Sequence, residues 1–463
     1  MTPNELCFAS ATWLAERLRA GELSSLEVVD AYLARIETVN PSLNAVVRLN
    51  DDAREDARRA DRERSNGAIR GPLHGLPFTA KDSLDTAGVV TTAGTVAWRE
   101  RVPARDATVV ARVRAAGGIL LGKTNTPEFT WSSETDNDVY GKTSNPYDLS
   151  RSPGGSSGGP AAIVAAGGSP FDIGSDTGDS IRQPSHVCGI AGLKPTSGRV
   201  PRTGHWPGYQ GLFESFTQLG PMARRVEDLE LLLPILAGPD GEDPHVPPVA
   251  LGDPWAVEIA SLRVVAFTHN GIQTPTAETV LAVEAAVQAI ADARAKVSRE
   301  VPPGLDDAWA AWDGMIRADG FAWLHRLIEA AGTPGWGSYA TRDWITPGDP
   351  LPGDRLTALI ERADAIRAGL LRWVQDVDLI VCPVAPHPAI LHGQSSDPRF
   401  NDTYSDVHNL TGWPAAVVRG GSSAEGLPIG VQLIAQPWRE DIALAGARVV
   451  EAASGGWQKP SLW

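Results

Sequence analysis

One lysine and two serines stand in parts of this chain that are suited to acyl-transfer chemistry. Such a reaction needs a nucleophile, a base, and donors aimed at the developing oxyanion. Lys81 ends an apolar, strand-like run, where burial would lower its pKa and make the neutral amine available as a base. Ser156 stands among four glycines, and Ser180 follows small residues whose amides could form an anion-binding nest. A serine hydroxyl could carry a proton between a nucleophile and the lysine.

A second interpretation makes Ser156 the nucleophile of an α/β-hydrolase. Residues 154–158 match G-x-S-x-G, the nucleophile elbow. An elbow follows a buried strand, whereas residues 145–153 (NPYDLSRSP) form a polar, turn-rich stretch. The nine histidines are scattered and none shares a motif with a candidate nucleophile, although His387 and His408 could complete a later triad. This alternative therefore stays open.

A third motif indicates nucleotide binding by its letters alone. Residues 117–124 (GGILLGKT) match the P-loop pattern G-x-x-x-x-G-K-[ST]. The interior of the motif is apolar and typical of a buried strand, and a helical pattern precedes it where a strand is required. Pro127 follows closely and disfavours a helix at that point. We therefore do not expect a phosphate-binding loop here.

Several longer segments together resemble the amidase signature family. They are GPLHGLPFTAKDS (71–83), GKTNTPEF (122–129), SNPYD (144–148), GGSSGG (154–159), GSDTGDSIRQPSHVCGIAGLKPTSGRVPRTG (174–204), NLTGWPAAVV (409–418) and GLPIGVQLIAQP (426–437). The resemblance covers most of the chain and is weakest from about residue 240 to 375.

The resemblance implies a Ser–cis-Ser–Lys triad. Ser180 would be the nucleophile, Ser156 would follow a cis peptide bond and relay the proton, and neutral Lys81 would be the base. The implied reaction is hydrolysis of an amide, and also of a carbamate or ester, through an acyl-enzyme. The resemblance further implies an oxyanion hole made of the backbone amides of Thr177, Gly178, Asp179 and Ser180, with Ser157, Asp176 and Arg182 in support.

Asp179 departs from the family pattern, which has glycine at this position. Aspartate tolerates a left-handed backbone better than most residues, so the turn could survive the replacement. Its carboxylate would nevertheless weaken an oxyanion hole if it pointed inward. We expect it to point away, toward a local hydrogen bond.

The elements that must position these residues alternate between strands and helices, which indicates α/β architecture. The family resemblance implies one large domain over residues 1–463, with a mixed central β-sheet flanked by helices on both faces. Its core motifs span 71–225, a variable Trp-rich region lies at about 300–350, and residues 376–463 return to the core. Local patterns predict strands at 76–80, 119–121 and 379–382, and helices within 10–45 (two, with a Ser24–Glu27 capping box), after an Asp106 cap, at 160–166 with Pro160 first, and at 442–452.

Tryptophans are concentrated in the variable region. The simplest interpretation is ordinary helix packing, and the functional alternative is an aromatic substrate pocket, which would favour a bulky or aromatic substrate. The candidate pocket residues are Trp131, Trp309, Trp312 and Trp336.

Composition limits the partners. The net charge of −15 disfavours nucleic acid and anionic membranes. Three cysteines without a CxxC pair, no signal-like start and no run long enough to span a bilayer lead us to expect a cytoplasmic protein without a disulfide framework. We expect no metal and no cofactor, and a small-molecule amide or carbamate as substrate. A homodimer, a catalytically inactive scaffold and an amidotransferase-type glutaminase subunit remain open.

Overall fold

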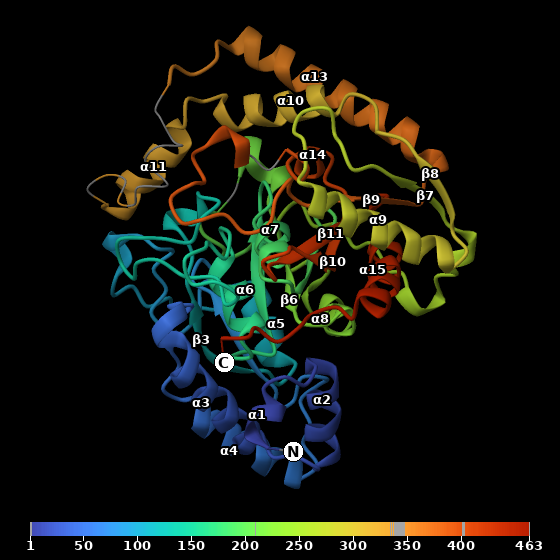
Figure 1. The fold of residues 1–463 in the computed structure, drawn as a ribbon. Helices are drawn as coiled ribbons and strands as arrows, with labels where there is room; N and C mark the ends of the chain where they lie inside the picture. The colour runs from blue at the N-terminus through green and yellow to red at the C-terminus, as the bar shows by residue number, and fades with distance from the viewer. Residues whose placement is uncertain are drawn as a thin grey trace.

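A computed structural model describes residues 2–462 except 209, 334, 336, 338–347, 401 and 402. Its strands form two sheets (Figure 1). The small sheet has the order β1-β3-β2, with bounds Val46–Leu49, Ile119–Thr124 and Pro77–Lys81. The large sheet has the order β4 (Phe171–Asp176), β6 (Gln218–Ala223), β5 (Ala191–Lys194), β10 (Ala415–Ser422), β11 (Pro428–Ala435), β9 (Leu379–Pro383), β7 (Arg263–Ala266) and β8 (Lys296–Arg299).

The large sheet is mixed, as predicted. Its pairs from β4 to β9 are antiparallel, whereas β9–β7 and β7–β8 are parallel. The helices are α1 (Pro3–Leu6), α2 (Ala11–Ala20), α3 (Ser25–Leu43), α4 (Ala53–Ser65), α5 (Thr108–Ala115), α6 (Gly158–Ala165), α7 (Arg182–Val187), α8 (Val226–Leu236), α9 (Ala277–Asp292), α10 (Leu305–Arg317), α11 (Ala322–Ala331), α13 (Gly353–Trp373), α14 (Val407–Leu410) and α15 (Glu440–Ser454).

Helices cover both faces of the large sheet, as strand β11 shows. Successive side chains of a strand point to opposite faces. A Cβ on Gly430 would lie 2.7 Å from the Cα of His186 in α7, so this face packs on α7. On the other face, Leu433 packs against Gly446 of α15. Figure 1 shows α15 beside β10 and β11. The face of β11 that carries Ile429, Val431, Leu433 and Ala435 is entirely apolar and packs under α15. The opposite face supports α7, the helix that follows the candidate nucleophile Ser180.

The two sheets meet along β2 and β4. The rings of Phe78 and Phe171 stack with centroids 5.6 Å apart. The buried Asp172 carboxylate on β4 accepts hydrogen bonds from Thr79 Oγ1 on β2 (2.5 Å) and Thr124 Oγ1 on β3 (3.0 Å). This junction holds the end of β2 against the end of β4, where Lys81 and the loop bearing Ser180 lie.

Most predicted elements are confirmed, with two corrections near helix starts. Two helices and the Ser24–Glu27 capping box are present within 10–45. Asp106 does not cap α5. Its carboxylate instead accepts from Ala87 N (2.7 Å) and pairs with Arg114 in the last turn of the helix. Helix α6 begins at Gly158, so Pro160 is its third residue.

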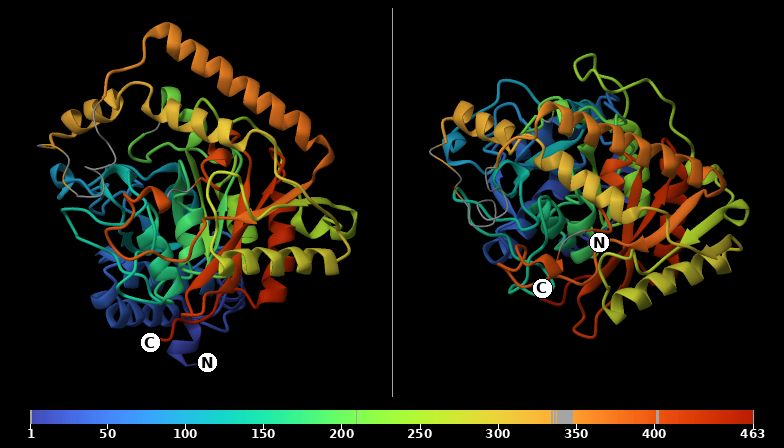
Figure 2. Two further views of the ribbon diagram at one scale, coloured as in Figure 1. Left: turned by 45° about the horizontal axis from the view of Figure 1, so that its top comes forward. Right: turned by 90° about the horizontal axis from the view of Figure 1, so that it is seen from above.

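The described helices of the Trp-rich region, α10 and α11, lie at the end of the molecule away from α1–α4 (Figure 1). Helix α10 packs against α13, which lies outside it (Figure 2). Their inner faces join α14 and part of the large sheet in a second apolar core. Among the described residues, no helix has both the length and the apolar character needed to cross a membrane.

Candidate active site

Lys81 lies at the end of β2 and is fully buried. Its Nζ lies within hydrogen-bonding distance of three serine hydroxyls: Ser156 Oγ at 2.6 Å, Ser157 Oγ at 2.9 Å and Ser175 Oγ at 2.9 Å. Ser156 and Ser157 are also buried. The structure therefore brings together the lysine and the glycine-flanked serine that the sequence singles out.

The surroundings of Lys81 favour its neutral amine. Burial lowers the pKa of Lys81 well below its usual value, because the charged ammonium loses water. The nearby carboxylates of Asp176, Asp172 and Asp179 raise the pKa and oppose this effect without cancelling it. A lysine with a lowered pKa is the form that can accept a proton near neutral pH.

The loop bearing Ser156 has close backbone contacts that require glycine. The Gly155–Ser156 peptide bond is cis, as the family resemblance implies. A Cβ on Gly155 would lie 2.4 Å from the carbonyl oxygen of Ser132. The N–H of Ser157 donates to the carbonyl oxygen of Ser180 at 3.2 Å, which joins this loop to the next. In the described part of the chain no hydrogen bond links the Ser156 and Ser180 hydroxyls, a contact that often tightens only with substrate bound.

Ser180 is half-buried and opens on a cavity of about 450 Å³. Thr177, Gly178 and Asp179 line the same cavity. Among the described residues, the N–H groups of Gly178 and Ser180 have no backbone or side-chain acceptor. Such groups, if aimed at a bound carbonyl, are the donors that stabilise an oxyanion.

Asp179 fits this loop without backbone strain. Its φ is not in the left-handed region, so the position does not demand glycine. The residue is 6% exposed, and its charge raises the pKa of the neighbouring Asp406. That its carboxylate points away from the oxyanion stays a prediction.

Arg182 and Asp176 form a fully buried ion pair behind the loop. Arg182 Nε donates to Asp176 Oδ2 at 3.0 Å, and Arg182 Nη2 to Asp176 Oδ1 at 2.9 Å. Arg182 Nη2 also donates to the Gly178 carbonyl and to Asn409 Oδ1. Burial alone would raise the pKa of Asp176, but the Arg182 charge and hydrogen bonds leave it below its usual value. The pair thus holds both ends of residues 176–182.

Three of the four candidate pocket tryptophans line the Ser180 cavity. They are Trp131, Trp309 and Trp312, whereas Trp336 lies outside the described residues. Trp312 also belongs to the second apolar core, so packing and pocket formation are not exclusive here. The cavity wall is completed by Thr130, Ser132, Ser133, Asp313, Arg317, Ser395, Ser396, Pro398, Phe400 and Asp406.

Comparison with known proteins identifies the family to which the chain belongs. A family model described as Amidase matches residues 27–444. The chain belongs to the amidase family. It is 36% identical to a glutamyl-tRNA(Gln) amidotransferase subunit from Synechococcus sp. (strain CC9605) over 95% of each chain. It is 34% identical to an acylamidase from Rhodococcus erythropolis, covering 98% of this chain and 97% of that one.

A solved structure supports the same assignment. The 6-aminohexanoate cyclic dimer hydrolase, complexed with substrate, has a TM-score of 0.88 and 30% identity to this chain, covering 98% of this chain and 99% of that one. The resemblance inferred from sequence motifs is thereby confirmed. The protein is an amidase-signature enzyme that hydrolyses carbon–nitrogen bonds.

The buried ion pair of this amidase permits a stability prediction. Arg182→Met leaves the Asp176 carboxylate buried without its counter-charge, so we expect unfolding to be easier by about 3–5 kcal/mol. The measurement is urea unfolding followed by circular dichroism. Arg399→Met is the matched control, because Arg399 is 79% exposed and pairs with Asp397 at the surface. Equal midpoints for the two variants would contradict the proposed importance of the buried pair.

Sequence reasoning missed three residues of the amidase site. Ser175 contacts Lys81, and Asn409 Nδ2 donates to Asp176 Oδ1 at 2.9 Å. Asp406 lines the cavity beside Gly178. Ser175 and Asn409 lie within motifs that signal the family, which could have pointed to them. Asp406 lies outside those motifs and has no local sequence signal.

The elbow alternative has no support from the geometry. Ser156 Oγ lies 2.6 Å from Lys81 Nζ, and no histidine hydrogen-bonds it in the described part of the chain. His387 Nδ1 instead contacts the carbonyl oxygen of Pro388. An α/β-hydrolase serine would need a histidine at this place.

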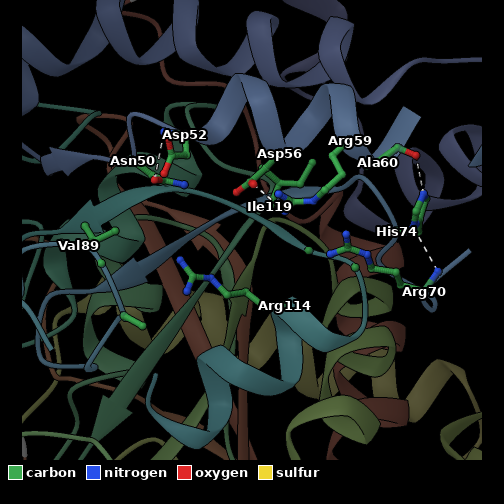
Figure 3. A pocket seen from close by; sticks show the side chains of 14 residues that line it. Asn50, Asp52, Asp56, Arg59, Ala60, Arg70, His74, Val89, Arg114 and Ile119 are labelled. Carbon is green, nitrogen blue, oxygen red and sulfur yellow. Dashed lines mark hydrogen bonds and ion pairs between the residues drawn. The ribbon is translucent and has the colours of Figure 1, made fainter. Parts of the chain in front are cut away.

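The P-loop pattern also fails structurally. Its apolar residues lie in the buried strand β3, not in a loop before a helix. Gly117 and Gly118 instead border a second cavity, of about 310 Å³, beside α4 (Figure 3). The arginines there are already paired, Arg59 with Asp56 at 2.6 Å and Arg114 with Asp106 at 2.9 Å. This cavity does not include the candidate triad.

The candidate triad consists of two hydroxyls and an amine, none of which is a typical metal ligand. Across the described ranges, no group of three or more His, Cys, Asp or Glu side chains is placed to hold a metal ion. Cys7, Cys188 and Cys382 are buried, and none of them forms a disulfide in the described structure. Burial raises the pKa of Cys7 to about 11, so its thiol stays protonated near neutral pH.

Proposed function

We propose that this enzyme hydrolyses small amides through an acyl-enzyme on Ser180, with Lys81 as base and Ser156 as proton relay. One observation carries the proposal. The buried Lys81 Nζ lies 2.6 Å from Ser156 Oγ, and the Ser156 loop is hydrogen-bonded to the loop whose Ser180 lines the cavity. A neutral lysine in this position can accept a proton that a serine hydroxyl passes on.

The steps follow from these positions. Ser180 Oγ attacks the substrate carbonyl carbon while its proton moves to Ser156 and the Ser156 proton moves to Lys81. Backbone N–H groups of residues 177–180 stabilise the oxyanion. The proton then returns through Ser156 to the leaving nitrogen as the carbon–nitrogen bond breaks. Water attacks the acyl-enzyme by the same relay and releases the acid, leaving Ser180 free.

Neighbouring groups hold the relay in place. Ser157 and Ser175 accept hydrogen bonds from Lys81 Nζ, each at 2.9 Å, and so direct it toward Ser156. The Arg182–Asp176 pair orders the loop that carries the oxyanion donors. These residues act through position and not through contact with substrate.

The cavity favours a bulky or aromatic small molecule. Trp131, Trp309 and Trp312 supply much of its apolar wall. The similarity to an acylamidase supports an amide, and carbamates and esters offer the same carbonyl to Ser180. We therefore include urethane-type substrates in the proposal.

A glutaminase subunit is the second candidate. It is favoured by 36% identity to a glutamyl-tRNA(Gln) amidotransferase subunit over 95% of each chain. In that case the enzyme would hydrolyse glutamine and co-purify with further subunits. The three tryptophans of the cavity wall argue for the stand-alone amidase.

A substrate panel separates the two candidates. We expect the purified chain alone to release 4-nitroaniline from an acyl 4-nitroanilide and from its carbamate analogue, with glutamine hydrolysed at least about 100-fold less efficiently, because glutamine has no aromatic or long apolar group to pack against the tryptophans of the wall. Release is followed by absorbance and glutamine hydrolysis by ammonia. Ser180→Ala is the control for contaminating hydrolases. Preferred hydrolysis of glutamine, or activity only with co-purified partners, would favour the amidotransferase role.

A further inference from the structure

One wall of the Ser180 cavity is formed by a loop, residues 392–400, which we call the wall loop. Ser395, Ser396, Pro398 and Phe400 line the cavity. Every residue of the wall loop is at least partly exposed, so packing in a core does not fix its position. The shape of this wall therefore depends on the groups that anchor the loop.

The carboxylate of Glu134 binds the backbone of the wall loop. Gly393 N donates to Glu134 Oε1 at 2.9 Å and to Oε2 at 3.0 Å, and Ser395 N donates to Oε1 at 3.0 Å. His392 Nδ1 lies 3.6 Å from Oε2. Glu134 is 5% exposed and is not one of the residues that line the cavity. The carboxylate thus holds the loop without lining the cavity itself.

Glu134 carries its negative charge at neutral pH. Burial alone would raise its pKa, but the interactions with His392, Gly393 and Ser395 leave the pKa below its usual value. Hydrogen bonds to a charged acceptor are about twice as strong as those between neutral groups. A buried carboxylate is therefore a strong anchor for two N–H groups of an otherwise exposed loop.

The other contacts of the wall loop lie toward its two ends. His392 N donates to the carbonyl oxygen of Ser150 at 3.3 Å, and Gln273 Nε2 donates to the carbonyl oxygen of Pro398 at 3.1 Å. Loss of the Glu134 carboxylate would therefore loosen the middle of the loop, which carries the cavity-lining serines, while its ends stay attached.

The segment around Glu134 also contacts the loop that bears Ser156. Thr135 Oγ1 donates to the carbonyl oxygen of Gly154 at 2.9 Å. A Cβ on Gly155 would lie 2.8 Å from Glu134 N. One short segment therefore contacts the loop of the proton relay through its backbone and Thr135, and the cavity wall through the Glu134 side chain.

We propose that Glu134 is a positioning residue that fixes the wall loop in the shape that binds the substrate. The inference rests on the proposed function and deepens it, because it assigns substrate selection to a residue outside the triad and the cavity lining. A loop that is ordered before binding loses less conformational entropy when the ligand binds, so the affinity is higher. Large substrates that reach the wall therefore depend on Glu134, whereas small amides do not.

The test compares two substrates of different size. Propionamide is small enough to contact only the reacting centre, whereas 4-phenylbutanoic acid 4-nitroanilide carries an aromatic ring on each side of its amide. In Glu134→Ala we expect KM for the anilide to rise at least about tenfold, and kcat/KM for propionamide to stay within about twofold of the wild type. Glu134→Gln should restore most of the anilide affinity, since its amide oxygen can accept from both N–H groups.

Glu425→Ala is the matched control, because the Glu425 side chain is 67% exposed and pairs with Arg151. It should leave both substrates unchanged. Glu134→Asp is the second variant, should the alanine variant not fold. It keeps the charge but is one methylene too short to reach both N–H groups, and it should raise KM for the anilide selectively. Equal losses for the two substrates, or no loss for the anilide, would overturn the inference.

Two measurements without turnover separate this inference from the proposed reaction. Calorimetric titration of Ser180→Ala with the anilide should show at least about tenfold weaker binding when Glu134→Ala is added. Hydrogen–deuterium exchange of residues 392–396 should be faster in Glu134→Ala than in the wild type. These results without wild-type turnover would support the positioning role and contradict the proposed hydrolysis. Wild-type turnover of the anilide, with affinity and exchange unchanged in the variants, would do the reverse.

Discussion

Ser180→Ala should lower kcat/KM for any amide substrate by at least about 10,000-fold, because the proposed reaction forms its acyl-enzyme on the Ser180 hydroxyl. The same change should abolish labelling by a fluorophosphonate, which reacts with activated serines. Intact mass followed by peptide mapping measures the label and its position. We expect one adduct per chain in the wild-type enzyme, located on Ser180.

Ser396→Ala is a suitable control for this experiment, since Ser396 lines the same cavity without contact to Lys81. It should keep the Ser180 label. A label on Ser156 would revive the elbow interpretation. No label on any serine would favour an inactive scaffold or a different nucleophile.

Lys81→Met should lower kcat by about 1,000-fold, which is within the range for losing a general base. Methionine keeps an unbranched chain of similar length but cannot accept the proton from Ser156. Fluorophosphonate labelling of Ser180 should be slowed without moving to another residue. Lys142→Met, at an exposed lysine, is the matched control and should leave both rates unchanged.

The pH dependence gives the lysine a specific signature. Because the neutral amine is the active form, kcat/KM for an uncharged anilide should fall as pH drops through the lowered pKa of Lys81, about tenfold per pH unit below it. Above that pKa the rate should be level. The residual rate of Lys81→Met should lack this acidic limb. Persistence of the limb in the variant would assign it to another group, such as Asp406.

Stabilities of these variants should separate catalysis from folding. Lys81→Met removes a group whose burial is costly, so the variant should be at least as stable as the wild type. Arg182→Met, in contrast, should be clearly destabilised. If Lys81→Met loses activity but stays stable, and Arg182→Met loses both activity and stability, then Lys81 acts in catalysis and Arg182 supports the structure of the site.

The sequence by itself determined the features that depend on local chain properties. The apolar run before Lys81 predicts a buried strand, and the glycines around Ser156 predict close backbone contacts. Both are confirmed, by β2 and by the 2.4 Å approach that a Cβ on Gly155 would make. The motifs around Ser180 indicated the family, which the match over residues 27–444 confirms. Helix caps were less predictable, since Asp106 binds Arg114 and not the start of α5.

Only the tertiary structure decided which distant residues complete the site. Asn409 reaches Asp176 across 233 positions of sequence, because β10 enters the sheet beside β5 and places α14 near the end of β4. Asp406 immediately precedes α14, and Trp309 lies in α10. The two residues form a hydrogen bond that no local sequence pattern predicts. Hydrophobic periodicity and the positions of glycines predict the local conformation and burial of a single segment. The residues that line a cavity depend instead on the strand order and helix packing that bring separate segments together.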